Sequence, residues 1–277
     1  MNTILLPTDF SEAAKNVAQY AIGLAQQLNA QKIIIYNAYQ YPVSVDPALN
    51  TPEFYDIKEF ENASEEGLIH FKVYMQSIAD ADTQIETISE QNIVNIGINE
   101  ISKKAYADVV IMGITGKDNL EETLIGSTAI DVAKDSLVPV IIVPAEAQFM
   151  PVKNILFACD FKNVGETIPV ETIKKFLTET GAKLFVVNIA DSNKENAEEI
   201  IDEGRTLEHL FNDVKPEYSF IDHVDFVEGI NQFATEKQID LIIIIPKKHG
   251  WLESLFKPSH TRKLAFHSHV ALMVIHE

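Results

Sequence analysis

The sequence predicts an α/β fold of two tandem units, each a five-stranded parallel sheet with helices on both faces. Segments of the first half of the chain recur in the second half. Within each half, short apolar segments alternate with segments of helical periodicity, a pattern typical of parallel sheets covered by helices. The apolar segments are hydrophobic along almost their whole length, as expected for strands buried on both faces.

The recurrence follows two constant offsets. The segment TILLPTDFSEAAKN, from Thr3, matches NILFACDFKNVGET, from Asn154, at an offset of 151 positions. A later block recurs at an offset of 132, where Asp108 falls on Asp240. We interpret the chain as a tandem duplication, with a first unit at 1–148 and a second unit at 152–277 that is shorter in its middle by the 19 residues separating the offsets.

The first elements follow from apolar spacing. Thr3–Leu6 is a short apolar strand, and Ser11 is a residue type that caps helix N-termini. Apolar residues then recur at helical spacing as far as Leu28, which predicts a helix over this stretch. Lys32–Tyr36, with the sequence KIIIY, is the second predicted strand.

A long polar segment, Tyr41–Gly67, follows the second strand and contains Pro42, Pro47 and Pro52. It leads into a helix near Glu59–Ser77. The segment could be a lid over a binding crevice, since it starts at the end of a strand. The alternative, which we favour, is a surface excursion that ends in an acidic amphipathic helix.

The rest of the first unit repeats the alternation. Gln84–Ile88 is the third predicted strand, Asn92–Tyr106 a helix and Val109–Met112 the fourth strand. A further helix begins near Ser127, and Val138–Val143 is the fifth strand. The second unit is expected to follow the same order.

The last strand of each unit, Val138–Val143 and Val270–Ile275, should be a sheet edge. Exposed edges are normally paired or covered, so the two units are expected to satisfy each other's edges as a pseudo-dimer within one chain. Two such chains could pair again as a homodimer.

Composition excludes several classes of protein. The net charge of −19 opposes binding to nucleic acid or to an anionic membrane. No apolar run is long enough for a membrane span, and the first residues lack the basic region of a signal peptide. The only cysteine is Cys159, so no internal disulfide can form and a reducing, cytoplasmic setting is expected.

Three glycines follow the fourth strand, at Gly113, Gly116 and Gly126. The first two would let the chain leave the strand with unusual φ values and bring bare backbone close to a ligand. In parallel sheets, ligands bind at the carboxyl ends of strands where strand order reverses. Asp9 and Gly113 each lie just past a strand, so they could converge on one crevice.

Gly126, Ser127 and Thr128 open a helix, whose free N–H groups and positive dipole end favour an anion. Lys117 could neutralise a terminal phosphate. The alternative is that these are ordinary turn and helix-start glycines. The segment is not a Walker A loop, because no Gly–Lys–Ser/Thr run is present.

The spacing G–x2–G–x9–G–S resembles the nucleotide-binding signature of the universal stress protein family. ILLPTDFS, VIMG and GSTAIDVAKDSLVPVIIVP also resemble that family, and the resemblance extends over both units. It implies a Rossmann-like, five-stranded parallel sheet of the adenine-nucleotide α-hydrolase type, and often ATP binding.

The resemblance implies roles for individual residues. Pro7, Thr8 and Asp9 would line the adenosine side, and the backbone of Ala38 would face the adenine edge. Met112 and Gly113 would pack near the ribose and phosphates. The phosphates, with Mg²⁺ or Mn²⁺, would be held by a further group: Gly116, Gly126, Ser127 and Thr128. Asp9 could instead be only a turn residue before the helix cap, and Met112 is expected to be a core residue that also touches the ligand.

The second unit has lost the glycines. Gly113 becomes Ile245, Gly116 becomes Lys248 and Gly126 becomes Pro258, while Asp160 still follows the first strand. An isoleucine side chain would fill the space that a phosphate needs. We therefore expect one nucleotide per chain, in the first unit only.

Two other features of the second unit carry less weight. Its seven histidines include His267 and His269, which could chelate a metal from one face of a strand, but no compact motif supports such a site. Lys247, Lys248 and His249 begin a basic cluster that could hold a small anion. Solvated surface residues are the expected interpretation of both.

The sequence favours a cytoplasmic, nucleotide-binding stress-response protein rather than an enzyme. No acid–base pair or activated nucleophile accompanies the glycines, and the first unit contains no arginine to stabilise phosphoryl transfer. Two alternatives stay open: an interaction module that needs no nucleotide, and a slow ATPase.

Overall fold

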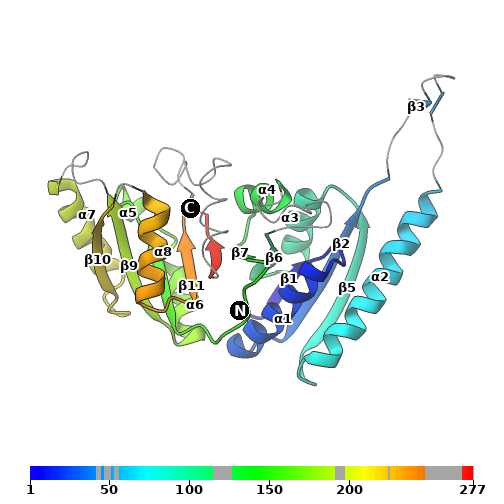
Figure 1. Ribbon diagram of the computed structural model, residues 1–277, viewed down its shortest axis with the longest axis horizontal. Helices are drawn as coiled ribbons and strands as arrows, with labels where there is room; N and C mark the ends of the chain where they lie inside the picture. Colours follow the sequence, from blue (N-terminus) through cyan, green and yellow to red (C-terminus); the bar gives the residue numbers. More distant parts are fainter. Residues whose placement is uncertain are drawn as a thin grey trace.

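The computed structural model (Figure 1) describes residues 1–41, 45–46, 51–52, 56–114, 127–190, 197–223, 225–246 and 270–276. The first unit has five strands in the main sheet: β1 (Thr3–Pro7), β2 (Lys32–Tyr39), β5 (Gln84–Gln91), β6 (Val109–Gly113) and β7 (Val140–Val143). Its helices are α1 (Glu12–Leu28), α2 (Ile57–Ile78), α3 (Val94–Lys104) and α4 (Ser127–Asp135). The predicted order of elements is confirmed.

The second unit repeats this order with five strands of its own: β8 (Asn154–Ala158), β9 (Lys183–Ala190), β10 (Glu217–Asp222), β11 (Leu241–Ile244) and β12 (Ala271–Val274). Its helices among the described residues are α5 (Val164–Thr167), α6 (Val170–Thr180), α7 (Ala197–Leu210) and α8 (Phe226–Glu236). The predicted class, an α/β fold of two tandem units with five parallel strands in each, is confirmed.

The length difference between the units lies between their second and third strands. Here α2 has 22 residues and its counterpart α7 has 14. The first unit also contains an antiparallel pair, β3 (Val45–Asp46) and β4 (Thr51–Pro52), which lies away from the main sheet in Figure 1. This placement fits the surface excursion that we favoured for the segment.

Helix α1 begins and ends where the sequence predicts. The Ser11 hydroxyl accepts a hydrogen bond from the Ala14 N–H at 3.2 Å, which satisfies one of the unpaired donors of the first turn. At the other end, Asn29 takes a left-handed conformation with φ of 52°, and its N–H bonds back to the Ala25 and Gln26 carbonyls. Both ends of the helix are therefore fixed by local sequence.

All ten main strands form one sheet, in the order β10-β9-β8-β11-β12-β7-β6-β1-β2-β5. Within each unit the strands are parallel, and strand order reverses between the first and fourth strands. This point lies between β1 and β6 in the first unit and between β8 and β11 in the second.

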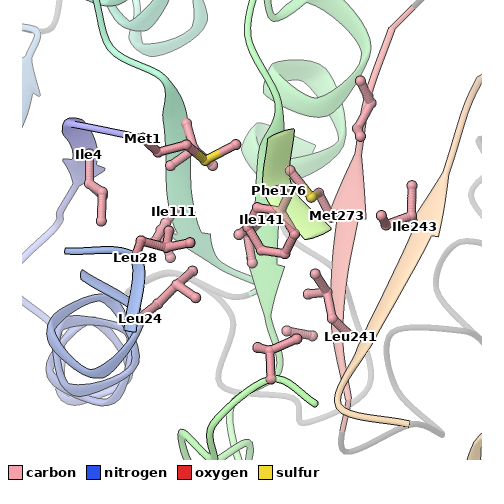
Figure 2. Packing of buried hydrophobic residues seen from close by; sticks show 14 of the residues in the cluster. Met1, Ile4, Leu24, Leu28, Ile111, Ile141, Phe176, Leu241, Ile243 and Met273 are labelled. Carbon is pink, nitrogen blue, oxygen red and sulfur yellow. The ribbon is translucent and has the colours of Figure 1, made fainter. Parts of the chain in front are cut away.

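The two units join through their last strands. Strand β12 pairs antiparallel with β7, with Met273 opposite Ile141, so the edges expected to pair do so within the chain. Figure 2 shows the side chains that pack here, where Ile111, Ile141, Met273 and Ile243 come from four neighbouring strands. These four side chains have no solvent exposure.

Helices cover both faces of this sheet. Buried side chains of α1, α2, α6 and α7 belong to one core cluster, and those of α3, α4 and α8 belong to the other. Among the described residues, no helix is both long and apolar enough to cross a membrane.

Polar contacts also connect the units beside the sheet. The Gln27 side chain, on α1, donates to the Val152 carbonyl at 2.8 Å and to the Thr180 carbonyl at 3.1 Å. Its carbonyl oxygen accepts from the Val152 N–H at 2.8 Å. One side chain therefore ties α1 to the connecting segment and to the end of α6.

An ion pair adds to this junction. Asp108 Oδ2 accepts from the N–H groups of Asn2 and Thr3 at 2.7 and 3.1 Å, and Asp240 does the same for Lys153 and Asn154 in the second unit at 2.8 and 2.9 Å. Only for Asp108 do the described contacts include a cation, Lys175 of α6, whose Nζ lies 2.6 Å from Oδ1. Burial alone would raise the pKa of Asp108, but the hydrogen bonds from Lys175 and the two N–H groups lower it overall.

Asp108→Asn is therefore expected to reduce stability at neutral pH by about 0.5–1 kcal/mol more than Asp240→Asn does, the usual range for a partly exposed ion pair. The folded-state pKa lies below the unfolded value of about 3.9, so the carboxylate's contribution is present above that pH and is lost as the pH falls through the folded-state value. Urea unfolding of both variants between pH 7 and pH 3 measures this. A difference that stays constant over this range would contradict the assignment.

Candidate nucleotide-binding site

The candidate site lies where strand order reverses in the first unit. β1 and β6 are parallel neighbours with Leu5 opposite Val110, so Pro7 and Met112 each lie two residues further toward the carboxyl ends. Pro7 is also opposite Tyr36 on β2, two residues before Ala38. The topology thus brings Pro7, Ala38 and Met112 to the same edge of the sheet, where ligands of open α/β sheets bind.

The turn after β1 is held by its own side chains. The Thr8 N–H continues the ladder by donating to the Tyr36 carbonyl at 2.9 Å, and the Thr8 hydroxyl accepts from the Phe10 N–H at 3.0 Å. Asp9 Oδ1 accepts from the Ser11 N–H, also at 3.0 Å. Asp9 therefore makes the turn contact that was one of its two expected roles, and this contact does not test the other.

Phe10 fixes the position of this turn against α2. Its φ is 63°, a left-handed value that a side chain adopts only when its surroundings hold it there. The ring packs edge-on against Phe71 at 6.1 Å between centroids. It also fills the space beside Gly67, where an added Cβ would come within 2.5 Å of the ring. The turn is therefore ordered by α2 as well as by β1.

Asn37 connects the turn to the adjacent strand. Its Nδ2 donates to the Thr8 carbonyl at 2.7 Å, and the next residue, Ala38, is half-buried opposite Glu90 of β5. In the second unit, Asn188 donates in the same way to the Cys159 carbonyl at 3.1 Å. This bridge was not predicted. The sequence did contain a sign of it, because Asn37 and Asn188 are equivalent positions at the offset of 151.

Gly113 requires a correction. It does not leave the strand with unusual φ, because it is the last residue of β6, paired with Val143, and the Ile114 N–H continues the ladder to the Val143 carbonyl at 3.1 Å. What glycine contributes here is the absence of a side chain. Met112 is 6% exposed and belongs to the core, as expected.

Several predicted residues lie outside the described part of the chain: Gly116, Lys117 and Gly126. Helix α4 does begin at Ser127, as the sequence predicts, and Thr128 in its first turn is exposed. The described part of the predicted site therefore consists of the residues expected on the adenosine side, Gly113 and the start of α4. We call Pro7, Thr8, Asp9, Ala38, Met112 and Gly113 the switch-point residues.

The same positions in the second unit are filled. Ala158, Cys159, Asp160 and Ile245 are each at most 1% exposed, and Ile245 packs in the core. Their counterparts Pro7, Thr8, Asp9 and Gly113 are all only half-buried. The two units thus have the same backbone frame but differ in whether side chains occupy the switch point.

Other candidate groups of the second unit have structural contacts where they are described. Cys159 Sγ accepts from the Phe161 N–H at 3.4 Å, and a ring nitrogen of His276 lies 2.7 Å from the Ala133 carbonyl of α4. His267 and His269 lie outside the described residues, as does the basic cluster from Lys247. Within the described ranges, no group of three or more His, Cys, Asp or Glu side chains could hold a metal.

The family model described as the universal stress protein family matches residues 1–144 and, a second time, residues 151–276. The chain belongs to the universal stress protein family. Two matches in one chain agree with the duplicated sheet, so this is a tandem universal stress protein.

Two proteins of Methanocaldococcus jannaschii are similar in sequence. Universal stress protein MJ0531 is 31% identical over 140 residues, which are 50% of this chain and 80% of that protein. Universal stress protein MJ0577 is 29% identical over 155 residues, which are 50% of this chain and 93% of that protein.

A solved structure, a universal stress protein from Archaeoglobus fulgidus, resembles the whole chain. Its TM-score is 0.69 at 20% identity, and the alignment covers 100% of this chain and 96% of that one. At this identity the likeness shows the fold, which includes both units.

Proposed function

We propose that the first unit binds an adenine nucleotide, ATP foremost, with Mg²⁺ or Mn²⁺, and that the protein acts through this binding in a cytoplasmic stress response. One observation carries the proposal. At the point where parallel sheets bind ligands, the first unit leaves Pro7, Thr8, Asp9 and Gly113 half-buried, whereas the second unit has buried side chains at these four positions: Ala158, Cys159, Asp160 and Ile245. A residue without a Cβ, as at Gly113, allows a phosphate to approach the backbone closely.

In this proposal the turn at Pro7–Asp9 and the backbone of Ala38 contact the adenosine. Gly113 lets the phosphates approach β6, and α4 offers the N–H groups of its first turn at Ser127 and Thr128. Gly116, Lys117 and Gly126 would complete the phosphate contacts with the divalent cation. The ion would supply charge neutralisation, and the chain supplies orientation.

The proposed role is binding rather than catalysis. The first unit contains no arginine, so the charge that develops in phosphoryl transfer would lack the usual guanidinium partner. The second unit would then serve as a structural or regulatory partner that covers the edge of β7. A homodimer of two tandem chains stays part of this proposal.

Gly113→Ile copies the residue of the second unit into the first, and it is expected to weaken ATP binding by about tenfold or more. The branched side chain would occupy the space beside β6 that the phosphates need. Isothermal titration with ATP and Mg²⁺ measures the effect, and thermal unfolding shows whether the variant still folds. Ile245→Val, at the matching position, is the control and should leave the affinity unchanged.

Two results would overturn the proposal: no ATP binding by the unmodified chain, or binding that Gly113→Ile leaves intact. The first would favour an interaction module that needs no nucleotide. Sustained phosphate release that is lost in Gly113→Ile would instead show an ATPase. The nucleotide content of the purified protein after mild denaturation would show whether ATP, ADP or AMP is retained.

A further inference from the structure

A chain of partly buried hydrogen bonds leads from the Thr8–Asp9 turn to helix α2. Asn37 Nδ2 donates to the Thr8 carbonyl, and Asn37 Oδ1 accepts from the Ser64 hydroxyl at 2.7 Å. The Ser64 and Ser89 oxygens are also 2.7 Å apart. A hydroxyl has one hydrogen, and that of Ser64 goes to Asn37, so Ser89 donates to Ser64. The chain thus joins β1, β2, α2 and β5.

Ser64 lies on the face of α2 that meets the turn. It is 3% exposed, and Gly67 and Phe71 follow it at helical spacing on the same face. These two residues contact the Phe10 ring, as described above. Helix α2 is therefore connected to the turn in two ways. It is linked to Thr8 through the hydrogen bonds of Asn37, and it packs on Phe10.

The second unit keeps the packing but not the serines. Phe161 repeats the left-handed conformation with φ of 51°, and its ring lies 3.7 Å from a Cβ built on Gly204 of α7. Ile201 lies three residues before Gly204, as Ser64 lies three residues before Gly67, and it is 55% exposed. Opposite Asn188 in the ladder, where the first unit has Ser89, stands Phe220. The serines occur only in the unit proposed to bind nucleotide.

We propose that Ser64 is a positioning residue that couples the placement of α2 to nucleotide binding at the Thr8–Asp9 turn. The inference rests on the proposed function of the first unit. The hydrogen bond from Ser64 fixes the Asn37 amide, and this amide in turn holds the Thr8 carbonyl. Asn37 is also the residue before Ala38, whose backbone is proposed to face the adenine. Nucleotide contacts on this turn therefore depend on where α2 lies, and by reciprocity bound nucleotide stabilises α2 in that place.

The reason for the coupling is that the half-buried Asn37 amide is held from its inner side by the buried Ser64 hydroxyl. Without the Ser64 hydroxyl, Asn37 Oδ1 would lose the hydrogen bond that it accepts from α2, and the amide could turn away from the Thr8 carbonyl. The turn would then keep its packing on Phe10 but lose the hydrogen bond that sets its carbonyl direction. The nucleotide would have to order it on binding, which weakens affinity.

Ser64→Ala tests this coupling in the full-length chain. We expect ATP, in the presence of Mg²⁺, to bind roughly three- to tenfold more weakly by isothermal titration. The control is Ser102→Ala on α3, because Ser102 is 2% exposed and its hydroxyl has no hydrogen-bond partner among the described contacts. Ser102→Ala removes the same atom from a buried helical site but should leave ATP affinity unchanged.

Hydrogen exchange provides a second measurement, whose result would not change if Ser64 had only a structural role. ATP should slow amide exchange in α2 around Ser64–Phe71 of the unmodified chain, but not in α7, and Ser64→Ala should reduce this protection. If the unmodified chain binds ATP while Ser64→Ala binds it equally well, or if ATP leaves exchange in α2 unchanged, the coupling is refuted. If the unmodified chain does not bind ATP, the proposed function itself fails, which is a separate result.

Discussion

Met273→Asp is expected to separate the two halves of the sheet and to destabilise the chain by about 4 kcal/mol or more. Met273 is fully buried at the centre of β12, opposite Ile141 on β7, within the core that both units share (Figure 2). A carboxylate here would have no described cation nearby and would be transferred from water into an apolar core. Because this strand pair joins the two five-stranded halves of the sheet, the effect should reach both units.

Urea unfolding followed by circular dichroism measures this effect. The unmodified chain should unfold in one transition, because the sheet and the Gln27 contacts continue across the junction. Met273→Asp should show an early transition of the second unit followed by the first. Met273→Leu, which nearly conserves volume, is the control and should cost less than about 1.5 kcal/mol. An unchanged midpoint in Met273→Asp would show that the two edges do not pair in solution.

The fold could be predicted because the same pattern of elements occurs twice in the sequence. Apolar runs and helix caps locate the elements, and the two offsets show that the second half repeats the first. The observed ends of some elements differ from the predicted ends, because they depend on the segments that each element contacts. Strand β2 continues to Tyr39 because its ladder with β5 does, and α3 ends at Lys104, before Tyr106 takes a φ of 51°.

The site was only partly predictable, for a related reason. Short motifs such as PTD and GST can be recognised along the chain, and they indicated the carboxyl end of β1 and the start of α4. The contacts that hold the turn come from residues far away in sequence, as when Ser64 meets Asn37, and no local pattern shows such pairs. The conformation of Gly113 was misjudged because β7 extends the ladder that far, which the residues around the glycine cannot show.

Gly97→Ala is expected to be among the most damaging single-atom additions in the first unit. A Cβ on Gly97 of α3 would stand 1.8 Å from the Tyr36 hydroxyl oxygen, far inside contact distance. The ring cannot withdraw, because Tyr36 is fully buried and its hydroxyl donates to Glu90 at 3.2 Å. Burial, with a smaller effect of Glu90, also raises the pKa of Tyr36, so the hydroxyl keeps its proton at ordinary pH.

Overpacking of a core costs about 1–3 kcal/mol, and alanine regains up to about 1 kcal/mol over glycine in a helix. Since the clash here is severe, we expect a net loss of roughly 2 kcal/mol and a melting temperature lower by about 5 °C. Gly165→Ala in α5 is the control, because the atom nearest to its added Cβ, Thr206 Cγ2, is 3.9 Å away. That variant should unfold close to the unmodified temperature.

A second substitution separates this clash from a general intolerance of α3. Tyr36→Phe alone removes the hydrogen bond to Glu90 and should destabilise the chain by about 1 kcal/mol. In the Gly97→Ala background the same change removes the oxygen at 1.8 Å and leaves only the milder contact of the ring Cζ at 2.8 Å, so it should raise stability instead. This result would show that the Tyr36 hydroxyl is the reason why residue 97 of α3 is glycine, since the sign of the stability change on Tyr36→Phe would depend on residue 97. If Tyr36→Phe lowers stability equally in both backgrounds, the two side chains do not meet and the packing between β2 and α3 differs from that described.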